Sequence, residues 1–87
     1  YKMTTKDITI DIKQGVEASP VAKCVQVASQ FESKIYVEYE TKKVNAKSIM
    51  GMMALGLVPG QTVKVSADGA DEAQAIESIE KYLGNKN

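Results

Sequence analysis

The feature that most constrains this chain is a short apolar segment, residues 49–58, which follows two residues suited to begin a helix. Asn45 and Ser48 have side-chain oxygens that can accept hydrogen bonds from the free N–H groups of a first helical turn. The segment contains three of the four methionines. A helix of about two turns can bury one face only. The sequence therefore predicts a short helix whose other face presents Met and Ile to solvent or to a partner.

Three other segments alternate apolar and polar residues with a period of two, the pattern of a strand with one buried face. They are residues 4–12, with Ile8, Ile10 and Ile12 on one side, residues 34–40, with Ile35, Val37 and Tyr39, and residues 62–67, with Val63 and Val65. A turn at Thr41 and Lys42 followed by a short return strand at residues 43–45 is also predicted. Residues 58–60, Val-Pro-Gly, are typical of a turn.

Two amphipathic helices complete the pattern. The first begins at Pro20, closes at Phe31 and places Val21, Cys24, Val25 and Ala28 on one stripe; the second ends at Gly84 and places Ala73, Ile76, Ile79 and Leu83 on another. The predicted order is β-α-β-β-α-β-α. Such a mixture favours an α+β fold in which a four-stranded antiparallel sheet carries three helices on one face. We expect a single domain over residues 1–87.

The charged residues and the missing histidine exclude several functions. Eleven lysines balance eleven acidic residues and there is no arginine, which argues against nucleic acid or an anionic membrane as a partner. The absence of histidine excludes imidazole bases, imidazole metal ligands and phosphohistidine chemistry. The single cysteine permits no internal disulfide, so we expect a cytoplasmic location. We interpret Asp68, Asp71 and Glu72 as a loop and helix start, and expect neither a metal nor a cofactor.

Several motifs together resemble one protein family. Residues 15–20, Gly-Val-Glu-Ala-Ser-Pro, resemble the active-site loop of HPr, the phosphocarrier of the bacterial sugar phosphotransferase system, whose pattern is Gly-Leu/Ile-His-Ala-Arg-Pro. Residues 44–51 resemble the regulatory-serine segment of its Gram-positive branch, and residues 38–39, 54–56 and 66–72 also fit. The resemblance covers nearly the whole chain. It implies the HPr-like open-faced β-sandwich.

Two departures from the family pattern bear on function. Glu17 stands where the family has its phosphorylated His, and Ser19 stands where it has its catalytic Arg. In the family, the His accepts a phosphoryl group from Enzyme I and passes it to a sugar-specific subunit. The resemblance thus implies that this chain has lost the carrier nucleophile, or that the role has moved to Glu17. The Glu17 carboxylate is either a simple helix-end replacement or a weak, permanent imitation of phosphohistidine.

Ser48 matches the serine that HPr kinase/phosphorylase modifies in Firmicutes, so the resemblance implies regulation there. A phosphate at a helix N-terminus is favoured by the free N–H groups. By the same matching, partner-binding residues are Lys47, Ile49, Met50 and Met53. The spacing alone leaves open that Ser48 merely caps the helix.

The layout is similar to that of Crh, a family member that also lacks the phosphorylatable His, keeps the serine and, when phosphorylated, acts as corepressor for a catabolite control repressor. Crh keeps the Arg, whereas Ser19 stands here; Lys23, one turn along the helix, is a candidate substitute for the charge. The resulting hypothesis is a non-enzymatic regulator that binds a transcriptional repressor or another regulatory protein. The alternatives are a phosphocarrier with degenerate transfer, and a phosphorylation-independent binder of a metabolic enzyme.

Overall fold

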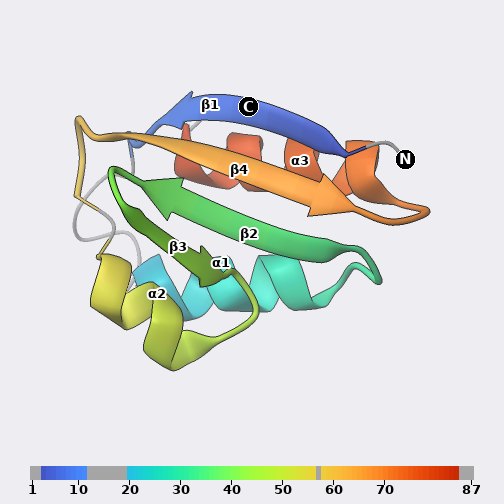
Figure 1. Ribbon diagram of the computed structural model, residues 1–87, viewed down its shortest axis with the longest axis horizontal. Coiled ribbons are helices and arrows are strands. Elements are labelled where there is room, and N and C mark those ends of the chain that lie inside the picture. The colour runs from blue at the N-terminus through green and yellow to red at the C-terminus, as the bar shows by residue number, and fades with distance from the viewer. Residues whose placement is uncertain (1–2, 12–19, 57, 85–87) are drawn as a thin grey trace.

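The computed structural model describes residues 3–11, 20–56 and 58–84. Its elements follow the predicted order: β1 (Thr4–Thr9), α1 (Pro20–Ser29), β2 (Lys34–Tyr39), β3 (Lys42–Asn45), α2 (Ile49–Leu55), β4 (Thr62–Asp68) and α3 (Glu72–Leu83). The strands form one antiparallel sheet in the order β1-β4-β2-β3. In Figure 1, α1 and α3 lie behind this sheet and α2 lies beside β3. The predicted α+β architecture, an open sheet with helices on one side, is confirmed.

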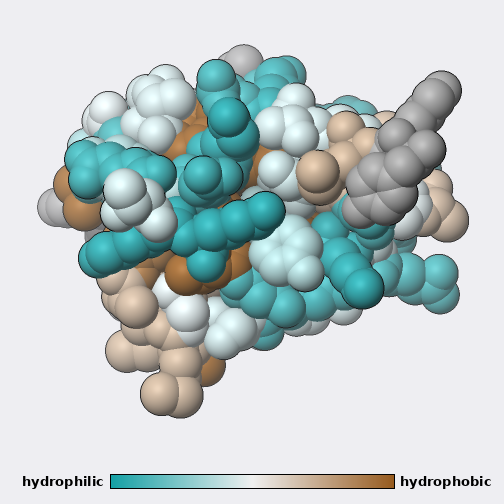
Figure 2. Space-filling model, viewed as in Figure 1, coloured by the Kyte–Doolittle hydropathy of each residue, from teal (hydrophilic) through white to brown (hydrophobic). Residues whose placement is uncertain are grey.

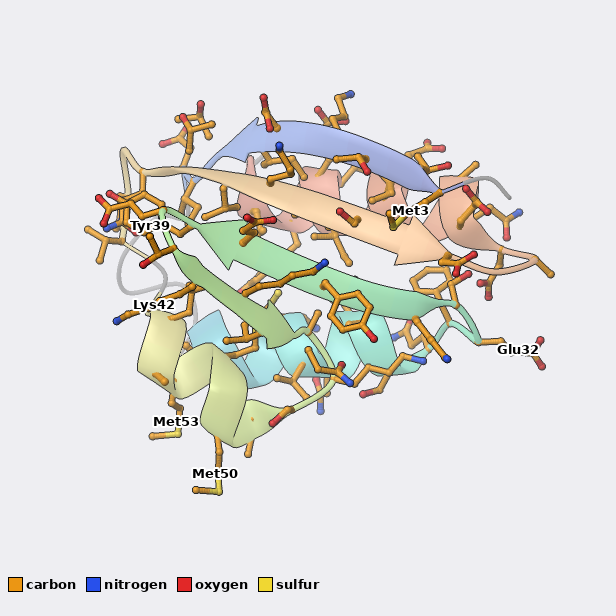
Figure 3. The ribbon with its side chains drawn as sticks, in the orientation of Figure 1. Met3, Glu32, Tyr39, Lys42, Met50 and Met53 are labelled. Atoms are coloured by element: carbon orange, nitrogen blue, oxygen red, sulfur yellow. The ribbon has the colours of Figure 1, made fainter. Side chains whose placement is uncertain are left out.

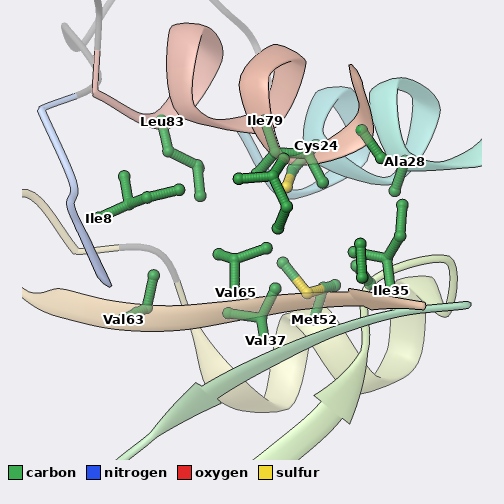
Figure 4. Packing of buried hydrophobic residues seen from close by; sticks show 14 of the residues in the cluster. Ile8, Cys24, Ala28, Ile35, Val37, Met52, Val63, Val65, Ile79 and Leu83 are labelled. Carbon is green, nitrogen blue, oxygen red and sulfur yellow. The ribbon is translucent and has the colours of Figure 1, made fainter. Parts of the chain in front are cut away.

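The core lies between the sheet and the helices, as Figure 4 shows. Each strand contributes alternate residues to it, because successive side chains of a strand point to opposite faces. The fully buried members with the largest side chains are Ile10, Ile35, Val37, Met52, Val63, Val65, Ile79, Leu83 and Cys24. Met52 comes from α2, so the short helix is anchored in the same core as α1 and α3.

The turn before β3 and the ends of β1 and α1 differ from the sequence prediction. β1 ends at Thr9, and the buried Ile10 continues beyond the strand by donating its N–H to the Gln61 carbonyl at 2.8 Å. Ile12 lies outside the described residues. The turn between β2 and β3 falls on residues 40–41, one residue earlier than predicted, because Glu40 adopts φ 57° there. α1 ends at Ser29, so Phe31 packs against the core from beyond the helix.

The buried stripe of α3 contains Ala75 rather than the predicted Ala73, which is exposed. At about 100° of rotation per residue, Ala75 lies about 40° from Ile79 around the helix axis, whereas Ala73 lies about 120° away. The predicted stripe has Ala73, Ile76 and Ile79 at intervals of three residues. Two such intervals place Ala73 outside the helix face that meets the sheet.

The corner between α1 and β2 is held by the loop that precedes α3. The Asp71 carboxylate accepts hydrogen bonds from the Glu32 and Ser33 amides, at 2.9 and 3.0 Å, and from the Ser33 hydroxyl. These hydrogen bonds favour the ionised carboxylate and lower the pKa of Asp71 below its usual value, the Ser33 hydroxyl contributing most. Asp71 occupies the N-cap position of α3, so the predicted helix start is confirmed, but its side chain makes no capping bond to the helix. Its partners are 38 and 39 residues away in the chain.

No helix among the described residues combines the length and the apolar character that crossing a membrane would require.

We expect Gly69→Ala to destabilise the fold, because a β-carbon there would lie 2.7 Å from the Ser33 Cα and 2.6 Å from its hydroxyl. The Ser33 backbone cannot move aside as the end of a flexible side chain can. The free energy of unfolding should therefore fall by about 1–3 kcal/mol, the usual cost of overpacking. Urea unfolding of both proteins measures it. Ala70→Ser, an exposed change in the same loop, is the matched control and should stay within about 0.5 kcal/mol of the parent. Equal stability of Gly69→Ala and the parent would contradict this close approach.

Candidate functional site

Ser48 caps α2, as the sequence predicts. Its backbone is extended, with φ −100° and ψ 115°, and its hydroxyl oxygen accepts a hydrogen bond from the Gly51 N–H at 3.2 Å. Its carbonyl accepts the first helical bond, from Met52 N at 3.0 Å. The Ser48 side chain is partly exposed. The hydroxyl is therefore ordered by the helix and still reachable from solvent.

The loop before Ser48 is shaped by Asn45. The Asn45 side-chain oxygen accepts a bond from the Lys47 N–H at 2.8 Å, and its carbonyl accepts one from the Ser48 N–H at 3.0 Å. These two bonds reverse the chain between β3 and α2, an Asx turn. Asn45 was predicted to be a helix-start residue. It lies three residues before the cap, where its two bonds form the turn that leads into α2.

Gly51 keeps the space beside the Ser48 hydroxyl open. A β-carbon at this position would lie 3.3 Å from the Val44 Cβ and 3.4 Å from the Ser48 Oγ. The first distance is tight and the second is an ordinary van der Waals contact, so a β-carbon here would fill the space between Val44 and the hydroxyl. The sequence did not single out Gly51, because a glycine within a short apolar helix carries no signal of which side chain lies over it.

α2 divides its residues between core and solvent. Met52 and Leu55 are buried, whereas Met50 is 79% exposed, Met53 66% and Ile49 48%. Figure 3 shows the Met50 and Met53 side chains pointing away from the body of the molecule. We call the group Ile49, Met50 and Met53 the methionine patch; Val58, 52% exposed, is a further exposed apolar residue that the sequence did not single out.

Lys47 has a partner that was not predicted. Its ammonium donates to the Phe31 carbonyl at 2.6 Å, so it ties the loop before α2 to the corner just after α1. The ammonium has three N–H donors, and this contact uses one of them. Sequence patterns cannot reveal this tie, because the two residues are 16 positions apart and meet only through the packing of α1 against α2.

Of the remaining predicted site residues, one lies on α1 and two lie outside the described residues. Lys23 is partly buried on α1. Glu17 and Ser19 lie outside the described residues. Cys24 is buried, and burial raises the pKa of its thiol to about 12, in keeping with a core role. Among the residues that the structure describes, no three potential ligand side chains are grouped so that they could hold a metal ion.

Comparisons with known proteins agree on one relationship. A family model described as "PTS HPr component phosphorylation site" matches residues 4–85. Two proteins named "HPr-like protein Crh", from Halalkalibacterium halodurans and Bacillus subtilis, are each 41% identical over 81 residues, which cover 93% of this chain and 96% and 95% of theirs. The crystal structure of a phosphocarrier protein HPr from Bacillus anthracis matches with a TM-score of 0.88 at 36% identity, over 95% of this chain and 99% of that one.

We expect Ser48→Ala to lower the free energy of unfolding by about 0.5–2 kcal/mol, because the Gly51 N–H loses its acceptor. Ser48→Asp should lose much less, since a carboxylate can accept the same bond. Chemical denaturation of the three proteins measures the difference. Equal stability of the Ala variant and the parent would show that the cap contributes nothing.

Proposed function

This chain belongs to the HPr family, and from that premise we propose that it is a Crh-like regulator of carbon catabolite control that is switched by phosphorylation of Ser48. The observation that carries the proposal is the place of the Ser48 hydroxyl, partly exposed and directly before the methionine patch. It is supported by the absence of any histidine that could carry a phosphoryl group.

The lack of a carrier nucleophile favours regulation over phosphotransfer. The residue that matches the family's phosphorylated His is Glu17, whose negative charge opposes an incoming phosphoryl group and whose carboxylate is a weaker nucleophile than imidazole. Ser19, which matches the catalytic Arg, cannot supply a charged fork to stabilise the transferred group. We therefore propose that Glu17 does not relay phosphate.

Phosphorylation of Ser48 would change the chemistry of the surface next to the methionine patch. The modification adds about 1.5–2 negative charges and three strong acceptor oxygens. The Gly51 N–H that now bonds the hydroxyl can bond a phosphate oxygen instead, and the two remaining donors of Lys47 are on the adjacent residue. A partner with Arg or Lys beside an apolar pocket would then bind the phosphate and the methionine patch at the same time.

The proposed partners are an HPr kinase/phosphorylase, which modifies Ser48, and a catabolite control repressor or another regulatory protein, which binds the modified form. Lys23 contributes to this binding in place of the missing Arg. A second candidate is a phosphorylation-independent binder of a metabolic enzyme. It is favoured by the exposure of Met50 and Met53, which are available to a partner without any modification.

We expect incubation with ATP and an HPr kinase/phosphorylase to add one acid-stable phosphoryl group, detected by intact mass. Ser48→Ala should add none, while its circular dichroism stays that of a folded protein. Incubation with phosphoenolpyruvate and Enzyme I should leave the mass unchanged. An acid-labile or acyl phosphate formed with Enzyme I would contradict the proposal in favour of phosphotransfer. No change of mass with either enzyme would contradict regulation by phosphorylation and would favour the second candidate, a phosphorylation-independent binder of a metabolic enzyme.

We expect Met50→Ser and Met53→Ser each to weaken binding of the Ser48-phosphorylated chain to a catabolite control repressor by tenfold or more, since a central apolar anchor contributes about 2 kcal/mol and about 1.4 kcal/mol is tenfold. Isothermal titration measures the affinity. Met3→Ser is the matched control, because Met3 is also exposed, at 44%, and lies outside the patch. Unchanged affinity in both patch variants would place the docking surface elsewhere.

A further inference from the structure

β1 is an edge strand of the sheet. In the part of the chain that the structure describes, the order β1-β4-β2-β3 gives β1 a neighbouring strand on one side only. Figure 1 shows β1 along the border of the sheet that lies opposite β3. An edge strand presents backbone N–H and C=O groups with which another extended chain can pair. The use of this edge therefore depends on which backbone groups point outward.

The hydrogen bonds of Ile10 show which groups these are. Its N–H donates to the Gln61 carbonyl and its carbonyl accepts from the Gly60 N–H, both at 2.8 Å, so Ile10 directs its backbone toward the chain entering β4. Alternate residues of a strand direct their backbone groups to opposite sides. Asp7 and Thr9 therefore direct theirs away from β4, where no described residue bonds them. The edge offers two donors and two acceptors.

A cavity of about 470 Å³ lies along this edge. It is lined by residues 7–11, by Gly60, and by Glu80 and Gly84 at the end of α3. The volume is within the range of ligand-binding clefts, roughly 300–1,000 Å³. The two glycines have no side chain that would fill it. The outward backbone groups of β1 thus face a hollow that an extended chain can enter.

The charge beside this edge is negative. The described residues that line the cavity include three carboxylates and no cation. Lys6 donates to Glu80 at 2.8 Å, which balances that charge. Asp7 and Asp11 are exposed and form no ion pair or side-chain hydrogen bond within the described residues, although Lys64 lies opposite Asp7 in the register. Two carboxylates are thus available to a cationic partner.

The two aspartates fix the spacing of the cations that would fit. Ile8 and Ile10 are buried, so Asp7, Thr9 and Asp11 share the opposite, outer face of the chain. Cations four positions apart on an added strand would lie opposite both carboxylates, at a separation of about 14 Å. The Asp11 N–H already donates to the Leu83 carbonyl at 2.7 Å, so there the contact is through the carboxylate.

The surface next to this edge favours a peptide over other cationic ligands. In Figure 2 the sheet face in view is mostly hydrophilic, whereas hydrophobic residues gather over α2. A partner at β1 is therefore held by backbone bonds and charge rather than by apolar contact. A metal ion would leave the outward backbone groups unpaired, and no three ligand side chains are grouped for one among the described residues.

We propose that the outward edge of β1, through the backbone of Asp7 and Thr9 and the carboxylates of Asp7 and Asp11, docks an extended segment of another protein that carries two lysine or arginine residues four positions apart. The segment adds to the sheet as a fifth strand. This surface uses neither Ser48 nor the methionine patch, so it is independent of the proposed regulation. Four backbone bonds and two exposed ion pairs make a weak contact that salt weakens further.

A nuclear magnetic resonance titration of the ¹⁵N-labelled chain tests the proposal. The probe is the end-blocked peptide Thr-Lys-Val-Thr-Val-Lys-Thr, added in about 0.01 M NaCl, where screening is weak. Amide signals of β1 should shift on addition of the peptide. The N–H groups of Asp7 and Thr9 should exchange with solvent about tenfold more slowly at saturation, because they gain acceptors.

Matched variants separate the contributions of charge and backbone. Asp7→Asn and Asp11→Asn should each weaken binding about threefold, and about tenfold together, as exposed cross-strand charge pairs do. Glu77→Gln, an exposed carboxylate of α3, should leave the affinity unchanged. A peptide with proline in place of its central threonine keeps both charges and lacks one N–H. It should bind about tenfold more weakly, since the Thr9 carbonyl loses its donor.

Three outcomes would overturn the proposal. Absence of any β1 shift at millimolar peptide would show that the aspartates only keep this edge from pairing. Equal binding of the proline peptide would show attraction of charge without strand addition. Protection of the Asp7 and Thr9 amides that rises with protein concentration in the absence of peptide would show that a second copy occupies the edge.

Discussion

The burial of Met52 and Leu55 fixes how α2 lies against the rest of the molecule, and the candidate site depends on that placement. A helix of seven residues has one side to bury, and these two side chains take it. Ile49, Met50 and Met53 must then face outward, and Ser48 must stand at the outer end of the first turn. Exposure of the methionines is thus a consequence of where the core lies. A seven-residue helix would be marginal in isolation, so its packing holds the cap in place.

Local patterns predicted the elements well, because each element here follows its own periodicity. Alternation located β1, β2 and β4, and the sequence before Ile49 located the cap at Ser48, whose geometry the structure confirms. The errors fall at element ends and on one helix face. Ile10 was predicted to belong to the first strand because it is apolar and two residues from Ile8, yet it is buried just beyond the end of β1. Ala73 was predicted to be buried because it lies three residues before Ile76, whereas the face that meets the sheet passes through Ala75.

Contacts between distant segments could not be read from the chain. Asp71 lies at the predicted start of α3, but its carboxylate bonds the Ser33 corner and not the helix. Lys47 was predicted to bind a partner, and its ammonium donates to the Phe31 carbonyl. In both cases the residue type suits the local role, but the side chain bonds a group from a distant part of the chain. The site itself was predicted in its cap and its patch. Which of its charges are already engaged required the tertiary structure.

The methionine patch lies at one edge of the sheet, and its place has a consequence for recognition. α2 lies beside β3 there (Figure 1). Phosphorylation of Ser48 adds negative charge to a chain whose formal net charge is zero. A screening length of about 8 Å at physiological salt limits the effect of that charge to nearby groups. Phosphorylation of Ser48 therefore changes mainly the charge of the surface beside the methionine patch, where the proposed partner binds.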